Sequence, residues 1–111
     1  MIRLGAAEVS DQAMGSIVRF AVESVPGARL DTPGRVSRVL PGRRGAVEWT
    51  VAGSVASVDV DVVAEHGRVL PELGDQVRTA VAEHLGRMTG LAVGTVDVTV
   101  TGLDHEREAR R

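Results

Sequence analysis

The 111-residue chain contains no cysteine and no lysine, and Phe20 and Trp49 are its only aromatic residues. The absence of cysteine excludes disulfides, thiolate metal sites and a cysteine nucleophile. The absence of lysine excludes a Schiff-base lysine and the lysine-containing phosphate loop of nucleotide-binding proteins. So few aromatic side chains also argue against a large apolar ligand site and against base stacking on single-stranded nucleic acid.

Long apolar runs are missing as well. No stretch approaches the roughly 20 apolar residues that a membrane-spanning helix needs, and the first ten residues lack the apolar core of a signal peptide. The net charge of −2 is typical of a soluble protein and gives no support to general nucleic-acid binding. We therefore expect a cytoplasmic protein without direct membrane insertion, which reaches the membrane, if at all, through a partner.

Two segments carry the pattern of an amphipathic helix. Ser10 suits the N-cap position, apolar residues recur at three- and four-residue spacing from Ala13 to Val25, and Pro26 with Gly27 ends the pattern. A second apolar stripe runs from Leu73 to Met88, after Pro71 at a first helical position and before Gly90 at a stop position.

Each predicted helix contains an internal glycine. Gly15 and Gly86 each cost about 1 kcal/mol relative to alanine in a helix interior. We expect at least one of them to allow a close contact, either between the two helices or between subunits. A stability gain without a change in assembly in Gly86→Ala would count against that role.

Alternation of apolar and polar residues predicts strands over 47–52, 56–64 and 95–101. Residues 2–4 predict a further short edge strand, and residues 27–45 predict a long loop. The predicted fold is α+β: a two-layer α-β-β-α-β sandwich with two helices on one face of a mixed sheet of three strands, or of four. The strand at 95–101 should run parallel to the strand at 56–64. Residues 1–103 form the single predicted domain and residues 104–111 a charged tail.

Two charged surfaces are candidates for partner binding, and no catalytic, cofactor or metal residue is expected. The predicted loop carries the only local excess of positive charge, and the solvent-facing side of the sheet carries acids that would face a basic partner. The candidate residues are Arg29, Arg35, Arg38, Arg43 and Arg44 in the loop, and Asp59, Asp61 and Asp97, beside Glu48, on the sheet.

Two other functions stay open at this point. Gly42-Arg43-Arg44-Gly45 has the letters of the GXXG loop with which KH domains clamp a nucleic-acid backbone, but in KH domains that loop joins two helices and here it precedes a strand. A regulatory subunit of a metabolic enzyme is the second alternative. No two histidines share metal-ligand spacing, and His84 is expected to bond a backbone group at the edge of the core.

With these elements placed, the chain resembles the alkaline-shock-protein family, the envelope stress response proteins of Gram-positive bacteria. The resemblance covers about Glu8 to Leu103 and rests on the order and spacing of several short motifs. These are Val9-Ser10-Asp11-Gln12-Ala13, Ser24-Val25-Pro26-Gly27, Val58-Asp59-Val60-Asp61-Val62, Leu70-Pro71-Glu72-Leu73, Gln76-Val77, Met88-Thr89-Gly90-Leu91, Val96-Asp97-Val98-Thr99-Val100 and Gly102.

The resemblance implies a small α+β protein without a catalytic motif. It further implies that the protein forms homo-oligomers and is recruited to the membrane by a separate anchoring protein. The sequence thus predicts a scaffold or partner-binding module, with self-association and a protein partner rather than nucleic acid.

Overall fold

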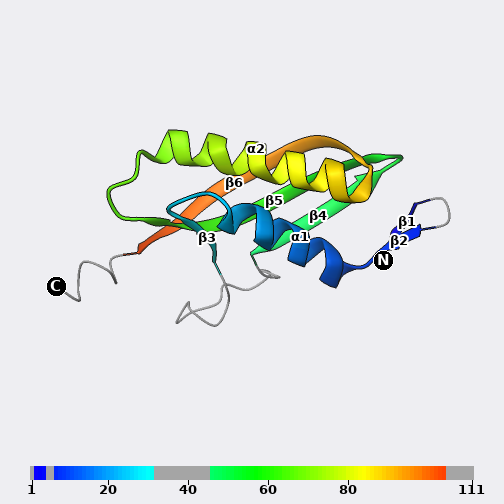
Figure 1. The fold of residues 1–111 in the computed structure, drawn as a ribbon, viewed down its shortest axis with the longest axis horizontal. Coiled ribbons are helices and arrows are strands. Elements are labelled where there is room, and N and C mark those ends of the chain that lie inside the picture. The colour runs from blue at the N-terminus through cyan, green and yellow to red at the C-terminus, as the bar shows by residue number, and fades with distance from the viewer. Residues whose placement is uncertain (1, 5–6, 32–45, 105–111) are drawn as a thin grey trace.

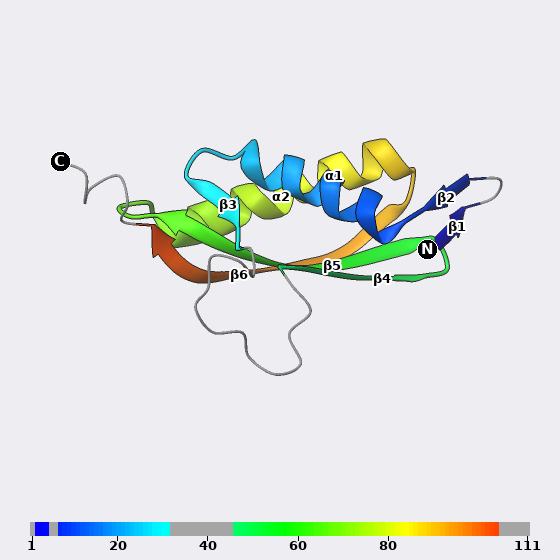
Figure 2. The same cartoon turned by 90° about the horizontal axis from the view of Figure 1, so that it is seen from below.

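The computed structural model describes residues 2–4, 7–31 and 46–104, and these residues form two layers (Figure 1). Helices α1 (Asp11–Glu23) and α2 (Leu70–Thr89) run in opposite directions over one face of a sheet, and neither helix covers the other face (Figure 2). The predicted α+β sandwich with both helices on one sheet face is confirmed. The sheet consists of β3 (Ala28–Leu30), β4 (Val47–Ala52), β5 (Val55–Glu65) and β6 (Ala92–Asp104).

Strand β5 lies at the centre of the sheet. Strand β6 runs parallel to β5 from Val55 to Glu65, so it occupies one whole edge of β5. Strands β3 and β4 are antiparallel to β5 and share its other edge, end to end. They meet at Asp61, whose carbonyl accepts from the N–H of Asp31 (2.9 Å) and whose N–H donates to the carbonyl of Ala46 (2.8 Å). The sheet is therefore mixed, as predicted, and has four strands.

Two predictions about short strands need correction. The loop predicted over 27–45 is wrong at Ala28–Leu30, because those residues pair with Val62–Ala64 of β5. Residues Ile2–Leu4 (β1) do form a strand, but they pair with Ala7–Val9 (β2) in a separate two-stranded unit and not with the sheet. Strand β6 ends at Asp104, the first residue of the predicted tail. Residues 32–45 and 105–111 lie outside the described part.

The helix ends follow from local chemistry. The Ser10 hydroxyl oxygen accepts a hydrogen bond from the N–H of Ala13 at 3.1 Å, which satisfies one of the free donors at the start of α1. Helix α2 has no side-chain cap at Val69 but has proline at its start. It ends at Gly90, whose φ of 76° lies in the left-handed region, and the Gly90 N–H donates to the carbonyl of Gly86 at 3.0 Å. The predicted stop at Gly90 is confirmed, and α1 ends at Glu23, before the predicted stop at Pro26 and Gly27.

The core lies between the helices and the sheet and is built almost entirely from aliphatic side chains. Alternate residues of β5 point into it, since successive side chains of a strand point to opposite faces. This arrangement gives the sheet one buried face and leaves the other to polar residues. The core side chains from β5 and the helices include Ala56, Val58, Val60, Val62, Ala64, Met14, Val18, Val22, Val77, Val81 and Leu85.

Neither internal helix glycine allows a close helix–helix contact. A Cβ atom at Gly15 would meet nothing within 4 Å, and one at Gly86 would meet only the carbonyl of Leu91 at 3.9 Å. The predicted contact between the two helices is therefore wrong, since both positions have room for a side chain. The predicted contact between subunits stays a prediction, because Gly15 borders an open depression beside β4.

Candidate functional site

The candidate site is a row of acids across the helix-free face of the sheet. Asp59 of β5 is paired in register with Glu48 of β4 on one side and with Asp97 of β6 on the other. All three side chains are exposed. Asp61 follows on the same face of β5, in register with Thr99. The structure thus confirms the predicted placement of these acids, and it brings Glu48, Asp59 and Asp97 side by side; we call these three residues the acid row.

The acid row is electrostatically unfavourable for the folded protein. The pKa of Asp59 is raised above its ordinary value, first by partial desolvation, then by a hydrogen bond with the Asp97 side chain and by the negative charges of Asp97 and Glu48. Because Asp59 is exposed, solvent and salt screen these interactions. The ionised Asp59 therefore opposes folding modestly, and a basic partner would relieve that opposition.

Neutralising the centre of the row should stabilise the protein in a pH-dependent way. A carboxyl whose pKa is raised in the folded state contributes stability below its unfolded pKa and loses it as the pH rises through its folded pKa. Asp59→Asn should therefore be more stable than the wild type at pH 7, and this gain should shrink as the pH falls into the carboxyl range. Urea unfolding from pH 3 to pH 8 measures it. A gain that stays constant with pH would show that the pKa of Asp59 is not raised in the folded protein.

Arg29 lies on β3 and not in a loop, which corrects its predicted surroundings. Its Nε donates to the Oδ2 of Asp104 at 3.2 Å, an ion pair between the ends of β3 and β6. Both side chains are partly buried. Arg29 is therefore occupied within the protein, in register with Val63, four residues along β5 from Asp59. Arg35, Arg38, Arg43 and Arg44 lie outside the described residues.

The described residues that flank the segment with these four arginines are Asp31 and Ala46, and both of them bond to the backbone of Asp61. The GXXG motif at 42–45 lies outside the described residues, so the structure gives the RNA-binding alternative no support.

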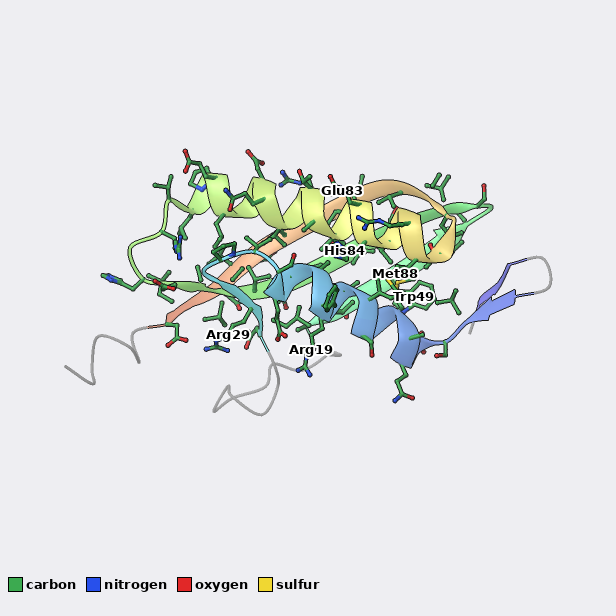
Figure 3. The ribbon with its side chains drawn as sticks, in the orientation of Figure 1. Arg19, Arg29, Trp49, Glu83, His84 and Met88 are labelled. Atoms are coloured by element: carbon green, nitrogen blue, oxygen red, sulfur yellow. The ribbon has the colours of Figure 1, made fainter. Side chains whose placement is uncertain are left out.

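The helix layer contains the histidine that the sequence places at the edge of the core. His84 faces α1, its Nδ1 lies 2.8 Å from the carbonyl of Ala80, and its ring meets that of Phe20 edge-on with centroids 5.4 Å apart (Figure 3). His84 is thus the boundary histidine that the sequence predicts. Within the described ranges, no group of three or more His, Cys, Asp or Glu side chains is arranged to hold a metal ion. No helix among the described residues is long and apolar enough to cross a membrane.

Sequence reasoning missed two side chains that bridge the layers at the sheet edges. The Arg78 Nε of α2 donates to the carbonyl of Val96 on β6 at 3.1 Å, while its Nη1 pairs with Asp75 at 2.6 Å. On the opposite side, the Trp49 indole of β4 donates to the Asp11 carboxylate of α1 at 3.0 Å. The Asp75–Arg78 spacing was visible in the sequence, but its contact with β6 depends on the tertiary fold.

These features define a small α+β domain with an acidic sheet face that neither of its described helices covers. Residues 2–105 match the alkaline shock protein 23 family, described as having a cell envelope-related function, and the chain belongs to that family. The resemblance that the sequence motifs carry is thereby confirmed.

Curated relatives carry the same association with stress. The chain is 31% identical over 100 residues to a stress response regulator gls24 homolog of Streptococcus pyogenes serotype M3, which covers 84% of this chain and 55% of the relative. The same values hold for the homolog of serotype M28. The chain therefore spans about half the length of the curated relatives it matches.

Solved structures show the same fold at low sequence identity. MamM-CTD H285A superposes with a TM-score of 0.53 at 13% identity and covers 86% of this chain and 100% of its own. MamM CTD C267S gives a TM-score of 0.51 at 16% identity, over 84% of this chain and 96% of its own. At this identity the likeness concerns the fold alone.

Proposed function

We propose that this protein is a non-enzymatic envelope stress response protein that acts as a self-associating scaffold or partner-binding module near the inner face of the cell membrane. Family membership supplies the envelope and stress setting. The observation that carries the proposal is the acid row, three exposed carboxylates in register on a sheet face that neither helix covers. Such a row destabilises the isolated protein and becomes favourable only against positive charge.

The partner that best fits this face is a protein segment rich in arginine or lysine, as a membrane anchor would present on its cytoplasmic side. Arg29 is paired with Asp104, which is in register with Glu65 and not with the acid row, so Arg29 does not neutralise the acid row. Self-association would use a different part of the sheet, its edges, because like-charged faces repel each other. The two kinds of contact can therefore occur together.

The test reverses one charge of the row. Asp97→Lys should lower recruitment to the membrane fraction of stressed cells several-fold, because it places a cation at the end of the acid row. The same substitution should also remove a repulsion that opposes folding. Glu72→Lys is the matched control, since Glu72 is an exposed acid on α2 and the net charge changes equally. Membrane fractionation and a pull-down with the tagged full chain measure recruitment and identify the partner.

Loss of recruitment in Asp97→Lys alone would support a docking face for a basic segment. Equal recruitment of both variants and the wild type would contradict it. Equal loss in both variants would show that only net charge matters, which would also contradict a specific surface.

A further inference from the structure

The two edges of the sheet are protected differently. On β5, the main-chain groups of Asp61 and Glu65 bond toward the side of β3 and β4. The main-chain groups of the residues between them in the alternation, at even-numbered positions, therefore bond toward β6. Val96 and Val98 of β6 are in register with even-numbered residues of β5. In a parallel pair their own main-chain groups therefore point away from β5, toward the outer edge of the sheet. Arg78 occupies the outward carbonyl of Val96 and is itself held by Asp75. A charged side chain laid on an edge strand is a known way of discouraging a further strand from pairing there.

Among the described residues, no charged side chain protects the outer edge of β4 in this way. The bond between Asp61 and Ala46 fixes the pattern of the antiparallel pair, so Glu48 and Thr50 bond inward to β5. Val47, Trp49 and Val51 therefore direct their main-chain groups outward. Among the residues that the structure describes, no strand pairs with this edge and no side chain bonds to those groups.

Space for another strand lies along the same edge. An open depression of about 740 Å³ is lined by Trp49 from the helix-covered face and by Asp59 from the open face, so it extends around β4. A second depression, of about 260 Å³, continues along Val47 and α1. Gly15 lines both depressions, and a side chain added there would meet nothing within 4 Å.

We infer that β4 is the self-association edge and that it pairs antiparallel with β4 of a second copy of this chain. The inference rests on the proposed self-association and names its surface. With the two-fold axis at Trp49, Val47 lies opposite Val51 of the second copy, and Glu48 lies opposite Thr50. Each pair matches in chemistry and no carboxylate meets another, because Val47-Glu48-Trp49-Thr50-Val51 has the same polarity pattern in both directions.

This pairing also explains the position of the only tryptophan. Trp49 is half-buried in the single copy, where its indole bonds to Asp11. At the axis of the pair it would lie beside Trp49 of the second copy, and aromatic cross-strand pairs are among the more stabilising ones. Because the chain has one tryptophan, its fluorescence reports on the surroundings of Trp49 alone.

The test places the same substitution at matched positions of the two edges. Val51→Pro removes an outward N–H of β4, and Val98→Pro removes an outward N–H of β6; both valines are half-buried on the helix-covered face. Val51→Pro should weaken self-association about tenfold to a hundredfold, since symmetry removes two main-chain bonds per pair, and Val98→Pro should not change it. Sedimentation velocity over a concentration series measures the affinity. The emission of Trp49 should shift to the blue with concentration in the wild type and Val98→Pro only.

The outcomes separate this inference from the function on which it rests. If Val98→Pro and not Val51→Pro dissociates the protein, the β4 edge is wrong while self-association stands. A wild type that stays monomeric at high concentration would overturn self-association and the β4 edge together. If circular dichroism shows Val51→Pro to be unfolded, Gly15→Arg fills the depressions from the helix side, with Gly15→Ala as its control. If Gly15→Arg dissociates the protein and Gly15→Ala does not, the result supports β4 as the self-association edge. If both variants associate equally, the result overturns that assignment.

Discussion

Val60→Asp should leave the protein unfolded at neutral pH. Val60 is 1% exposed on the helix-covered face of β5, between two aspartates that point the other way. An unpaired carboxylate in this aliphatic core costs several kcal/mol, and loss of the valine side chain adds to that cost. The sum is comparable to the total stability of a domain of this size, about 5–15 kcal/mol. Far-UV circular dichroism and urea unfolding measure the effect.

The control for Val60→Asp adds the same charge to the other face of the sheet. Thr99→Asp places a carboxylate beside Asp61 on the exposed face, where water solvates it, and should cost about 1 kcal/mol or less. A Val60→Asp protein with the unfolding midpoint of the wild type would contradict the assignment of the buried face. Partial refolding of Val60→Asp at acidic pH would agree with it, because burial raises the pKa of a carboxyl and protonation removes the charge.

The faces of the sheet were predictable from the sequence because the information is local. Alternation over Val58-Asp59-Val60-Asp61-Val62 assigns each side chain to a face before any partner strand is known. The ends of α1 and α2 were predictable for the same reason, since Ser10 and Gly90 act on their own helix termini. The placement of the acids on one exposed face therefore followed from the sequence.

The features that were missed depend on distant parts of the chain. Three residues of β3 carry no measurable period, and they become a strand only because β5 offers an edge beyond the end of β4. The Arg29–Asp104 pair joins residues 75 positions apart. Which strands lie at the edges of the sheet also depends on the strand order, and local sequence patterns do not determine that order. This is why the sequence placed Arg29 in a basic loop and gave no sign that Arg78 covers the edge of β6.

The two faces of the sheet contribute to different properties of the protein. The helix-covered face holds the aliphatic core and provides the stability, whereas the acid row on the other face opposes it. Loss of stability at one surface is common where that surface serves binding, because the partner later offsets the repulsion. Variants of the core and variants of the open face or the edge should therefore change different measurements.

Leu85→Ala should lower the free energy of unfolding by about 2–5 kcal/mol and leave self-association intact. Leu85 is fully buried at the inner side of α2, a helix that packs on α1 and β6. Truncation to alanine leaves a cavity there, but α2 is not part of the β4 edge. Urea unfolding at fixed protein concentration measures the stability, and sedimentation below the unfolding transition measures the affinity.

The matched control is Met88→Ala, one turn further along α2, because Met88 is 63% exposed and its truncation leaves no cavity. It should cost about 1 kcal/mol or less. Equal losses in the two variants would contradict the packing of α2 against the sheet. A large fall in the self-association affinity of folded Leu85→Ala would show that self-association uses the helix layer. That result would contradict β4 as the self-association edge, even if the Val51→Pro protein also dissociates.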